Sequence, residues 1–335
     1  MDRAALVALP KAELHVHLEL SIAPHLAEEF AAARGMGQPD RGPWPDQATF
    51  VRECEQVRDL IGSLDDLSRV AEALVVAADR QGIWWTEVTC APFNYGGALG
   101  PEEGVVEAVL DGLRTGCRST GRGAGVILAH NRGHEAGIGR RVLALCERFR
   151  AGQDGDPGVV ALGLVGDEAG YPPELFVELF TEAREHGVNR VPHAGEADGP
   201  AAIRRAWLGL DAQRIAHGAR AAESPELVAE LAGAEVCLDL CPSSNVALHA
   251  APSLAEHQLP RLRAAGVPVS VGSDCTYLMG VDLLDEYAAL ETAMGLNPVQ
   301  IAGVARDSLR HSFAPGALVV DALADWERWC ATRLP

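Results

Sequence analysis

The sequence predicts an α/β fold, a (β/α)8 TIM barrel with extra helices inserted after the first strand. Eight short segments are rich in apolar and β-branched residues, and helical material follows each of them. Strands that alternate with helices form parallel crossover units, and eight such units in 335 residues favour closure into a barrel. The same periodicity is also compatible with a doubly wound open sheet. The segments span residues 12–18, 83–91, 124–130, 159–165, 189–194, 213–218, 235–241 and 267–273.

Several longer segments have helical patterns. These patterns cover 174–186, 222–232, 282–294 and 316–332. Asn297 before Pro298 is typical of an N-cap followed by proline at the first helical position. The interval 19–82 contains a Gly/Pro-rich patch at 35–46 between helical patterns, and we expect this insertion to form a lid or a pocket wall. Since no linker or repeat divides the chain, residues 1–335 are expected to form one domain.

The composition is that of a globular protein with an acidic surface. Hydrophobic residues make up 48% of the chain, and 47 acidic against 28 basic residues give a net charge of −19. Such a surface repels a polyanion, which excludes nucleic acid as a partner. The eight cysteines form no CxxC pair and indicate a reducing compartment. The chain has no signal-peptide pattern and no apolar run of membrane-span length, so we expect a cytoplasmic protein and leave homo-oligomerisation open.

Side chains that can bind a metal stand at the predicted ends of four strands. His15 and His17 lie two apart, so they point to the same face of the first strand. His193 ends the fifth strand, His217 the sixth and Asp274 the eighth. Each alone has an ordinary explanation, as a hydrogen-bonded core histidine or a helix N-cap. Together they predict a metal site, because barrel active sites form at the carboxyl ends of the strands.

Three imidazoles and a carboxylate form a nitrogen and oxygen site that suits Zn²⁺, with a further position open to water. Water acidified by such an ion can attack an aromatic carbon at neutral pH. Glu196 is the nearest unassigned carboxyl group, and we expect it to supply a proton. The end of the fourth strand at 166–168 has no lysine that could be carboxylated to bridge two metals, which favours a single ion.

Six short motifs and the segment PKAELHVHL at 10–18 together resemble those of a known protein family. The six motifs are HVHLE at 15–19, GDE at 166–168, HAGE at 193–196, HG at 217–218, CPSSN at 241–245 and SD at 273–274. In this order they resemble the motifs of the adenosine deaminase family, over about residues 10–310. The resemblance implies a zinc-dependent hydrolytic deaminase that acts on an aminopurine, a small-molecule substrate, with one Zn²⁺ per chain.

The resemblance also implies a role for each site residue. The zinc ligands it implies are His15, His17, His193 and Asp274. Glu196 matches the acid that protonates the ring nitrogen, and His217 matches the group that orients and helps deprotonate the attacking water. Gly166 matches a backbone contact to the purine, and Arg132 matches an arginine with a structural role.

Three positions depart from the family pattern, and all three are expected to touch the substrate. Cys275 stands where a second aspartate usually contacts purine N7, and a thiol is a weak donor. Glu19 is the residue of the adenine-specific branch rather than the aspartate that meets the ribose, and Leu20 replaces a glycine. We expect Glu19, Gly166 and Cys275 to bind substrate, and we favour a changed substrate over neutral drift.

Two other functions remain open at this stage. One is a zinc hydrolase of the same superfamily that acts on a non-purine amino-heteroaromatic compound or an amide. The other is a catalytically silent binding protein that keeps the fold. The Glu196 and His217 pair fits displacement of an amine from a ring better than amide hydrolysis, and the intact set of metal and acid–base residues argues against a silent protein.

Overall fold

A computed structural model describes residues 1–42, 44, 47–152 and 154–334. Its sheet has eight parallel strands in the sequential order β1 to β8. The strands are β1 Lys11–His17, β2 Ile83–Cys90, β3 Gly123–Asn131, β4 Val159–Val165, β5 Asn189–Ala194, β6 Arg214–His217, β7 Cys237–Leu240 and β8 Val269–Val271. The Asp274 amide donates to the His15 carbonyl at 3.0 Å, and the His17 amide donates to the Asp274 carbonyl at 2.8 Å. These bonds join the segment after β8 to β1 and so close the sheet. The predicted (β/α)8 barrel is therefore confirmed, and the alternative of an open sheet is excluded.

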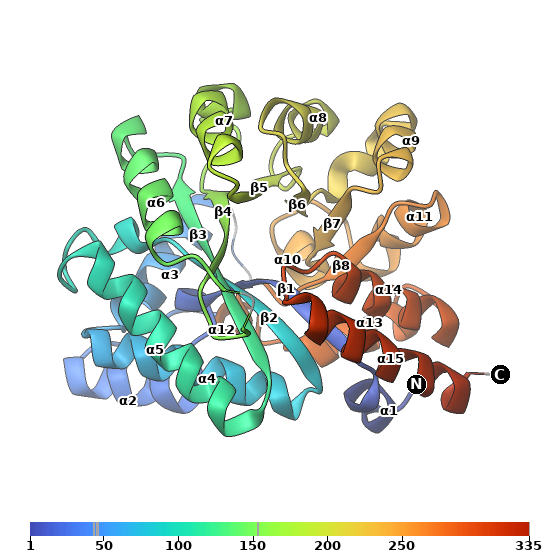
Figure 1. The fold of residues 1–335 in the computed structure, drawn as a ribbon, viewed down its shortest axis with the longest axis horizontal. Coiled ribbons are helices and arrows are strands. Elements are labelled where there is room, and N and C mark those ends of the chain that lie inside the picture. Colours follow the sequence, from blue (N-terminus) through green and yellow to red (C-terminus); the bar gives the residue numbers. More distant parts are fainter. Residues whose placement is uncertain (43, 45–46, 153, 335) are drawn as a thin grey trace.

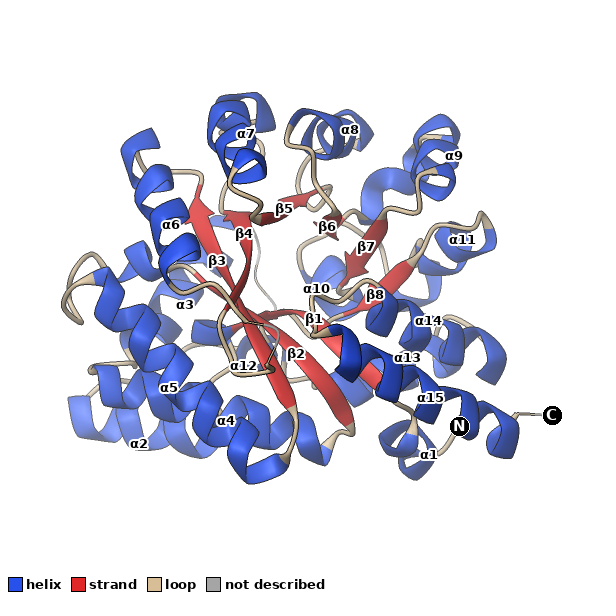
Figure 2. Ribbon diagram, viewed as in Figure 1, coloured by secondary structure: helices blue, strands red, loops and turns tan. Residues whose placement is uncertain are grey.

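Helices cover the outside of the barrel. Figure 2 shows the strands at the centre with the helices around them, and Figure 1 follows them in chain order. One helix after each strand packs in this outer layer: α4 Leu64–Arg80, α5 Glu102–Thr120, α6 Ala136–Arg148, α7 Val177–Glu185, α8 Pro200–Gly209, α9 Pro225–Gly233, α11 Leu259–Ala264 and α14 Pro298–Arg310. The remaining helices are α1 Arg3–Ala8, α2 Pro24–Arg34, α3 Gln47–Asp59, α10 Pro242–Ala247, α12 Thr276–Met279, α13 Leu283–Thr292 and α15 Gly316–Arg333. Short 3₁₀ turns lie at Leu18–Leu20, Pro92–Tyr95, Pro173–Phe176, Ala219–Glu223 and Leu254–Glu256.

The insertion after β1 contains helices, as the sequence predicts. Helices α2 and α3 precede α4, which is the helix that returns the chain to β2. Of the Gly/Pro-rich patch at 35–46, residues 43, 45 and 46 lie outside the described residues. The predicted cap at Asn297 is also confirmed, because its side chain accepts from the Gln300 amide while the Gln300 side chain accepts from the Asn297 amide.

The last three strands are shorter than the segments that predict them. Strand β8 ends at Val271, so Asp274 lies three residues beyond the strand and does not end it. Asp274 itself has a φ of 59°, in the left-handed region that strand residues do not adopt. Gly272 makes the approach to β1 possible, because a Cβ there would lie 2.5 Å from the His15 carbonyl oxygen.

A layer of buried charge lies inside the barrel. Arg214 of β6 donates to Glu87 of β2 at 2.5 Å and to Asp239 of β7 at 2.6 Å. All three side chains are at most 1% exposed, so the guanidinium and the two carboxyl groups are paired with one another rather than with solvent. Bonds of this kind cross the barrel and tie three strands together at fixed positions, which holds the neighbouring strand ends in register.

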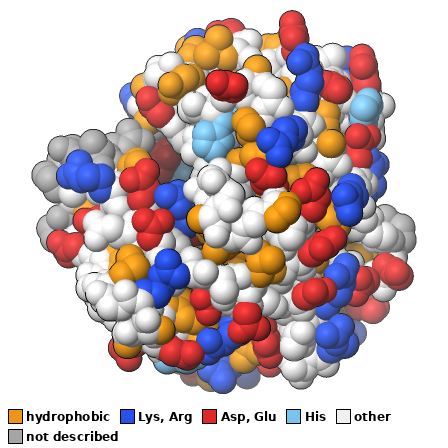
Figure 3. Space-filling model, turned by 90° about the vertical axis from the view of Figure 1, so that its left-hand side faces the viewer, with side chains coloured by type: hydrophobic (Ala, Val, Ile, Leu, Met, Phe, Trp, Pro, Cys, Tyr) orange, Lys and Arg blue, Asp and Glu red, His pale blue; other side chains and the backbone are white. Residues whose placement is uncertain are grey.

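Charged side chains of both signs lie on the surface. On the face drawn in Figure 3, acidic and basic side chains are interspersed, and the basic ones form no continuous patch there. All eight cysteines are free of disulfides. Among the described residues, no helix is long and apolar enough to cross a membrane.

Candidate active site

Five side chains predicted from the sequence converge above the carboxyl end of the barrel. The Nε2 atoms of His17 and His193 are 3.1 Å apart. The Oδ1 atom of Asp274 lies 3.4 Å from His17 Nε2 and 3.6 Å from His15 Nε2. The ring of His217 is 4.5 Å from the ring of His15, measured between centroids. The structure thus brings together residues from β1, β5, β6 and the segment after β8.

Two of these residues have a strained backbone. His217 and Asp274 have φ values of 65° and 59°, which non-glycine residues rarely adopt. Backbone bonds hold the strain in place: Asp274 is bonded to both His15 and His17, and the amide after His217 donates to the Ala194 carbonyl at 2.8 Å. Strain of this kind costs about 1–3 kcal/mol and persists where the surroundings impose it, which is common at functional sites.

The donor set fits a zinc ion. Within the described residues, both ring nitrogens of His15 are buried with no hydrogen-bond partner, an expensive arrangement that a metal would relieve at the nitrogen carrying the lone pair. Burial holds the pKa of His15 and of His193 well below the ordinary value, so both rings are neutral. Burial alone would raise the pKa of Asp274, but attraction to His15 and the neighbouring imidazoles outweighs it, and the carboxyl pKa lies well below its usual range. Neutral imidazoles and an ionised carboxylate are the forms that bind zinc.

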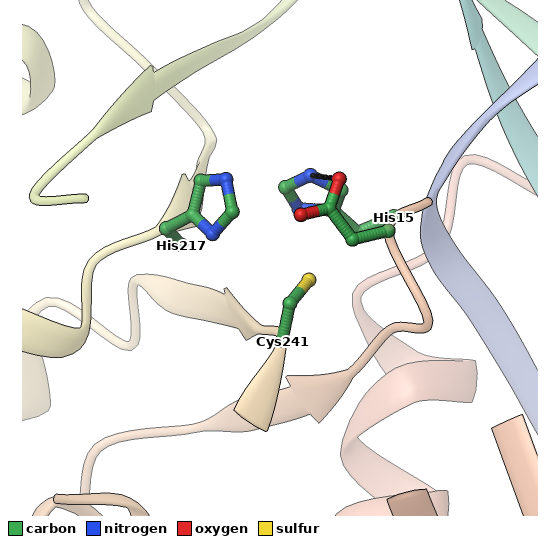
Figure 4. A group of neighbouring side chains, drawn as sticks. His15, His217 and Cys241 are labelled. Carbon is green, nitrogen blue, oxygen red and sulfur yellow. Dashed lines mark ion pairs between the residues drawn. The ribbon is translucent and has the colours of Figure 1, made fainter. Parts of the chain in front are cut away.

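A cysteine that the sequence analysis did not single out as a ligand also faces this cluster. Cys241, just after β7, points between His15 and His217 (Figure 4), and ligand atoms of these three residues and Asp274 lie within 4.8 Å of one another. Its thiol hydrogen is engaged, since Sγ donates to the Asp239 carbonyl at 3.8 Å. Burial raises the pKa of this thiol well above its ordinary value. To bind zinc, this thiol would have to lose its proton and with it the hydrogen bond to the Asp239 carbonyl, a cost that favours the three-histidine and aspartate set.

The two residues expected to handle protons lie beside this cluster. His217 Nε2 is 3.5 Å from Glu196 Oε1, and both residues line the same cavity. The Glu196 side chain is enclosed by the cavity walls, with 19% of its surface exposed. Desolvation, together with the charges of Asp274 and Glu168, raises the pKa of Glu196 well above its usual value. A raised pKa favours the protonated form of the carboxyl group, and that form can act as a general acid.

A buried carboxylate holds the loop that carries Glu196. Glu168, just after β4, accepts four backbone hydrogen bonds, at 2.6 to 3.2 Å, from the amides of residues 195–198. Arg132 supports the same segment, since its Nη2 atom donates to the His193 carbonyl at 2.6 Å. The GDE motif could have indicated this role for Glu168, but from sequence alone nothing connects it to a loop 27 residues away.

We expect Glu168→Gln to misplace Glu196 without removing a metal ligand. The side-chain nitrogen of glutamine is a donor and would face loop amides that are also donors, where the carboxylate oxygen now accepts their hydrogen bonds. The loop must therefore shift. A shift of roughly 1 Å at a catalytic group can lower kcat by about 10²-fold. Steady-state kinetics and metal analysis check this result. Glu174→Gln is the control, because Glu174 is an exposed carboxylate paired with Arg205, and such surface pairs contribute little. A fully active Glu168→Gln enzyme would contradict the loop-anchoring role.

The residues expected to bind substrate line one cavity of about 700 Å³ above the cluster. Gly166 has a φ of 97°, and a Cβ there would lie 2.5 Å from Asn131 Oδ1, so glycine is required. Glu19 Oε1 accepts from the Ala91 amide at 3.1 Å. The Cys275 thiol donates to Asp274 Oδ1 at 3.3 Å, which leaves it without a hydrogen for a substrate nitrogen.

Helix α3 forms a wall of this cavity, as expected for the insertion after β1. From α3 the cavity is lined by Phe50, Val51, Arg52, Cys54, Glu55 and Arg58. Leu20 and Leu248 also line it, so the space above the catalytic cluster is bordered by both apolar and charged side chains.

A parallel barrel with histidine and carboxylate side chains at the carboxyl ends of its strands is the arrangement of metal-dependent hydrolases. Residues 10–322 match the model of the adenosine deaminase family, and the chain belongs to this family. It is therefore a hydrolytic deaminase, as the sequence motifs imply.

Individual relatives agree with this assignment. A Streptomyces coelicolor protein provisionally named adenosine/adenine deaminase is 34% identical, with 96% of each chain covered. Aminodeoxyfutalosine deaminase of Streptomyces coelicolor is 32% identical and covers 93% of this chain and 83% of its own. The crystal structure of adenine deaminase from Arthrobacter aurescens superposes with a TM-score of 0.89 at 27% identity, over 97% of this chain and all of that one. Because these relatives are named for different substrates, the family does not define the substrate here.

Proposed function

We propose that this protein is a zinc-dependent aminohydrolase that releases ammonia from an aminopurine, and that residues 1–335 act as one catalytic domain. The observation that carries the proposal is the convergence of His15, His17, His193 and Asp274 beside the Glu196 and His217 pair, on the floor of one cavity. This set supplies metal ligands and proton-transfer groups at the same place. One Zn²⁺ per chain would be held by the first four residues.

The chain's own residues would divide the reaction between them. The zinc ion, when bound, would acidify water and so supply the nucleophile. Glu196, whose raised pKa favours the protonated form, would give its proton to the ring nitrogen next to the attacked carbon. His217, whose Nε2 atom lies 3.5 Å from Glu196 Oε1, would orient the attacking oxygen. The cavity walls would hold the ring and limit the access of bulk water.

We propose that the substrate is a free base or, better supported by the cavity, a purine with a substituent other than plain ribose. A cavity of about 700 Å³ holds much more than a bare purine ring. The Cys275 thiol donates to Asp274 and so cannot hold purine N7, and Leu20 occupies space beside Glu19. An ammonia-release assay on adenine, adenosine and 5′-substituted adenosines tests the function. Absence of ammonia release from every aminopurine by the zinc-loaded protein would contradict it.

We expect poor kcat/KM for adenosine and a gain from Cys275→Asp. In its protonated form the new carboxyl group would donate to purine N7 and recover a hydrogen bond worth about 1–3 kcal/mol, or roughly ten- to hundred-fold in kcat/KM for adenine-type rings. Adding Leu20→Gly should raise the value most for the nucleoside. Cys54→Asp is the matched control, since it places a carboxylate on the α3 wall of the same cavity. If the wild-type protein deaminates adenosine near the diffusion limit, the three departures are neutral and this proposal is wrong.

A further inference from the structure

A chain of three hydrogen bonds reaches His217 from the outer layer of the barrel. The Leu259 amide, at the start of α11, donates to His257 Nδ1 at 3.1 Å. His257 Nε2 lies 3.1 Å from Asn245 Oδ1, and Asn245 Nδ2 lies 3.3 Å from His217 Nδ1. The three side chains are at most 4% exposed, so water cannot take the place of any partner.

The direction of every bond follows from its first donor. A backbone amide only donates, so His257 Nδ1 must accept. A neutral imidazole has one acceptor nitrogen, so His257 Nε2 must carry hydrogen and donate to the Asn245 oxygen. In the opposite orientation of the Asn245 side chain, its nitrogen would donate to His257 Nε2. Both ring nitrogens of His257 would then have to accept, which only an imidazolate could do. The Asn245 nitrogen therefore faces His217 Nδ1 and donates to it.

The backbone also fixes the middle residue of this chain. The Asn245 amide donates to the Cys241 carbonyl at 2.8 Å, and the Asn245 carbonyl accepts from the Ala251 amide at 2.9 Å. Both bonds fix the backbone position from which the Asn245 side chain reaches His217. Burial lowers the pKa of His257 to about 4, in keeping with a neutral ring.

We propose that Asn245 and His257 are positioning residues that fix the tautomer of His217, so that its hydrogen lies on Nε2, the atom that faces Glu196 and the cavity. In this tautomer the neutral ring has no lone pair at Nε2. His217 then acts on the reaction by donating a hydrogen bond to the oxygen that attacks the ring or to the Glu196 carboxyl group. This keeps the orienting role implied by the family resemblance and removes the deprotonating one.

The tautomer can be read without any substrate. In zinc-loaded protein with ¹⁵N-labelled histidine, the two ring nitrogens of neutral His217 have distinct chemical shifts, and a His217→Gln variant assigns them. We expect hydrogen on Nε2 in the wild type. In Asn245→Asp the carboxylate can only accept, so the hydrogen should move to Nδ1, and kcat should fall roughly ten- to hundred-fold, as for other residues that orient a catalytic group.

Two further variants keep the test decisive if Asn245→Asp fails to fold. His257→Gln retains an amide donor near the position of Nε2 and should preserve the tautomer. His257→Leu removes the donor and should give a mixture of tautomers. His130→Leu is the control. It removes another buried histidine, which takes no part in the hydrogen bonds that link Leu259 to His217, and it should leave the His217 signals unchanged.

Hydrogen on Nδ1 of wild-type His217, or an unchanged tautomer in both Asn245→Asp and His257→Leu, would overturn the proposal. The catalytic part of the inference rests on the proposed deaminase function, whereas the tautomer does not. Correct tautomers without any deaminase activity would therefore reject the function and keep the positioning role.

Discussion

Replacing His15 by alanine is expected to remove the zinc ion and the deaminase activity together. His15 is 1% exposed, and both of its ring nitrogens lack hydrogen-bond partners among the described residues, so a metal is the natural use for this ring. Loss of the metal removes several kcal/mol of transition-state stabilisation, so activity should fall by at least about 10³-fold. Elemental analysis of the purified variant should find far less than the one zinc per chain expected of the wild type.

Asp274→Ala should behave in the same way, while Cys241→Ala is the matched control. Cys241 lies in the same cluster, but its thiol donates to the Asp239 carbonyl, and burial raises the pKa of this thiol, so its deprotonation is costly. Cys241→Ala should therefore keep about one zinc per chain. The opposite pattern, with metal lost in Cys241→Ala and kept in His193→Ala, would assign the ion to His15, His217, Cys241 and Asp274 instead. Full activity of the wild-type protein after exhaustive chelation would reject the zinc site altogether.

The fold could be predicted from the sequence because its signals are local. Most strands are short runs rich in apolar residues, and each of the eight predicted segments overlaps an observed strand. The histidines could be placed because residues two apart share a face and because parallel strands end at the same rim. The position of Asp274 was predicted less well, since the left-handed turn that carries it has no local sequence signal.

The supporting residues could not be predicted because their partners are distant in sequence. Glu168 acts on amides 27 or more residues away, and His257 reaches His217 only through Asn245. A buried carboxylate, a histidine and an asparagine all have common structural uses, so their types alone indicate no role. Cys241 belongs to a motif quoted from the sequence, but only the fold places its thiol between His15 and His217.

Glu196→Gln is expected to keep zinc and to lose most of the turnover. Glutamine preserves the shape of the side chain but has no proton to give to the ring nitrogen, so kcat should fall about 10²–10⁴-fold. The variant should also change the pH profile. A general acid works while it is protonated, so wild-type kcat should fall as the pH rises through the raised pKa of Glu196, and that limb should be absent in the variant.

Metal content and kinetics of the same preparation separate this role from the alternatives. Glu196 Oε1 is 3.5 Å from His217 Nε2. Among the described residues, two groups have ligand atoms within 4.8 Å of one another, and Glu196 belongs to neither: His15, His17 and His193, and His15, His217, Cys241 and Asp274. Its substitution should therefore leave about one zinc per chain, in contrast to His15→Ala. If Glu196→Gln loses its metal, then Glu196 is a ligand and the assignment of His193 or Asp274 is wrong. If it keeps both metal and wild-type turnover, another group protonates the ring, and the raised pKa of Glu196 reflects its burial alone.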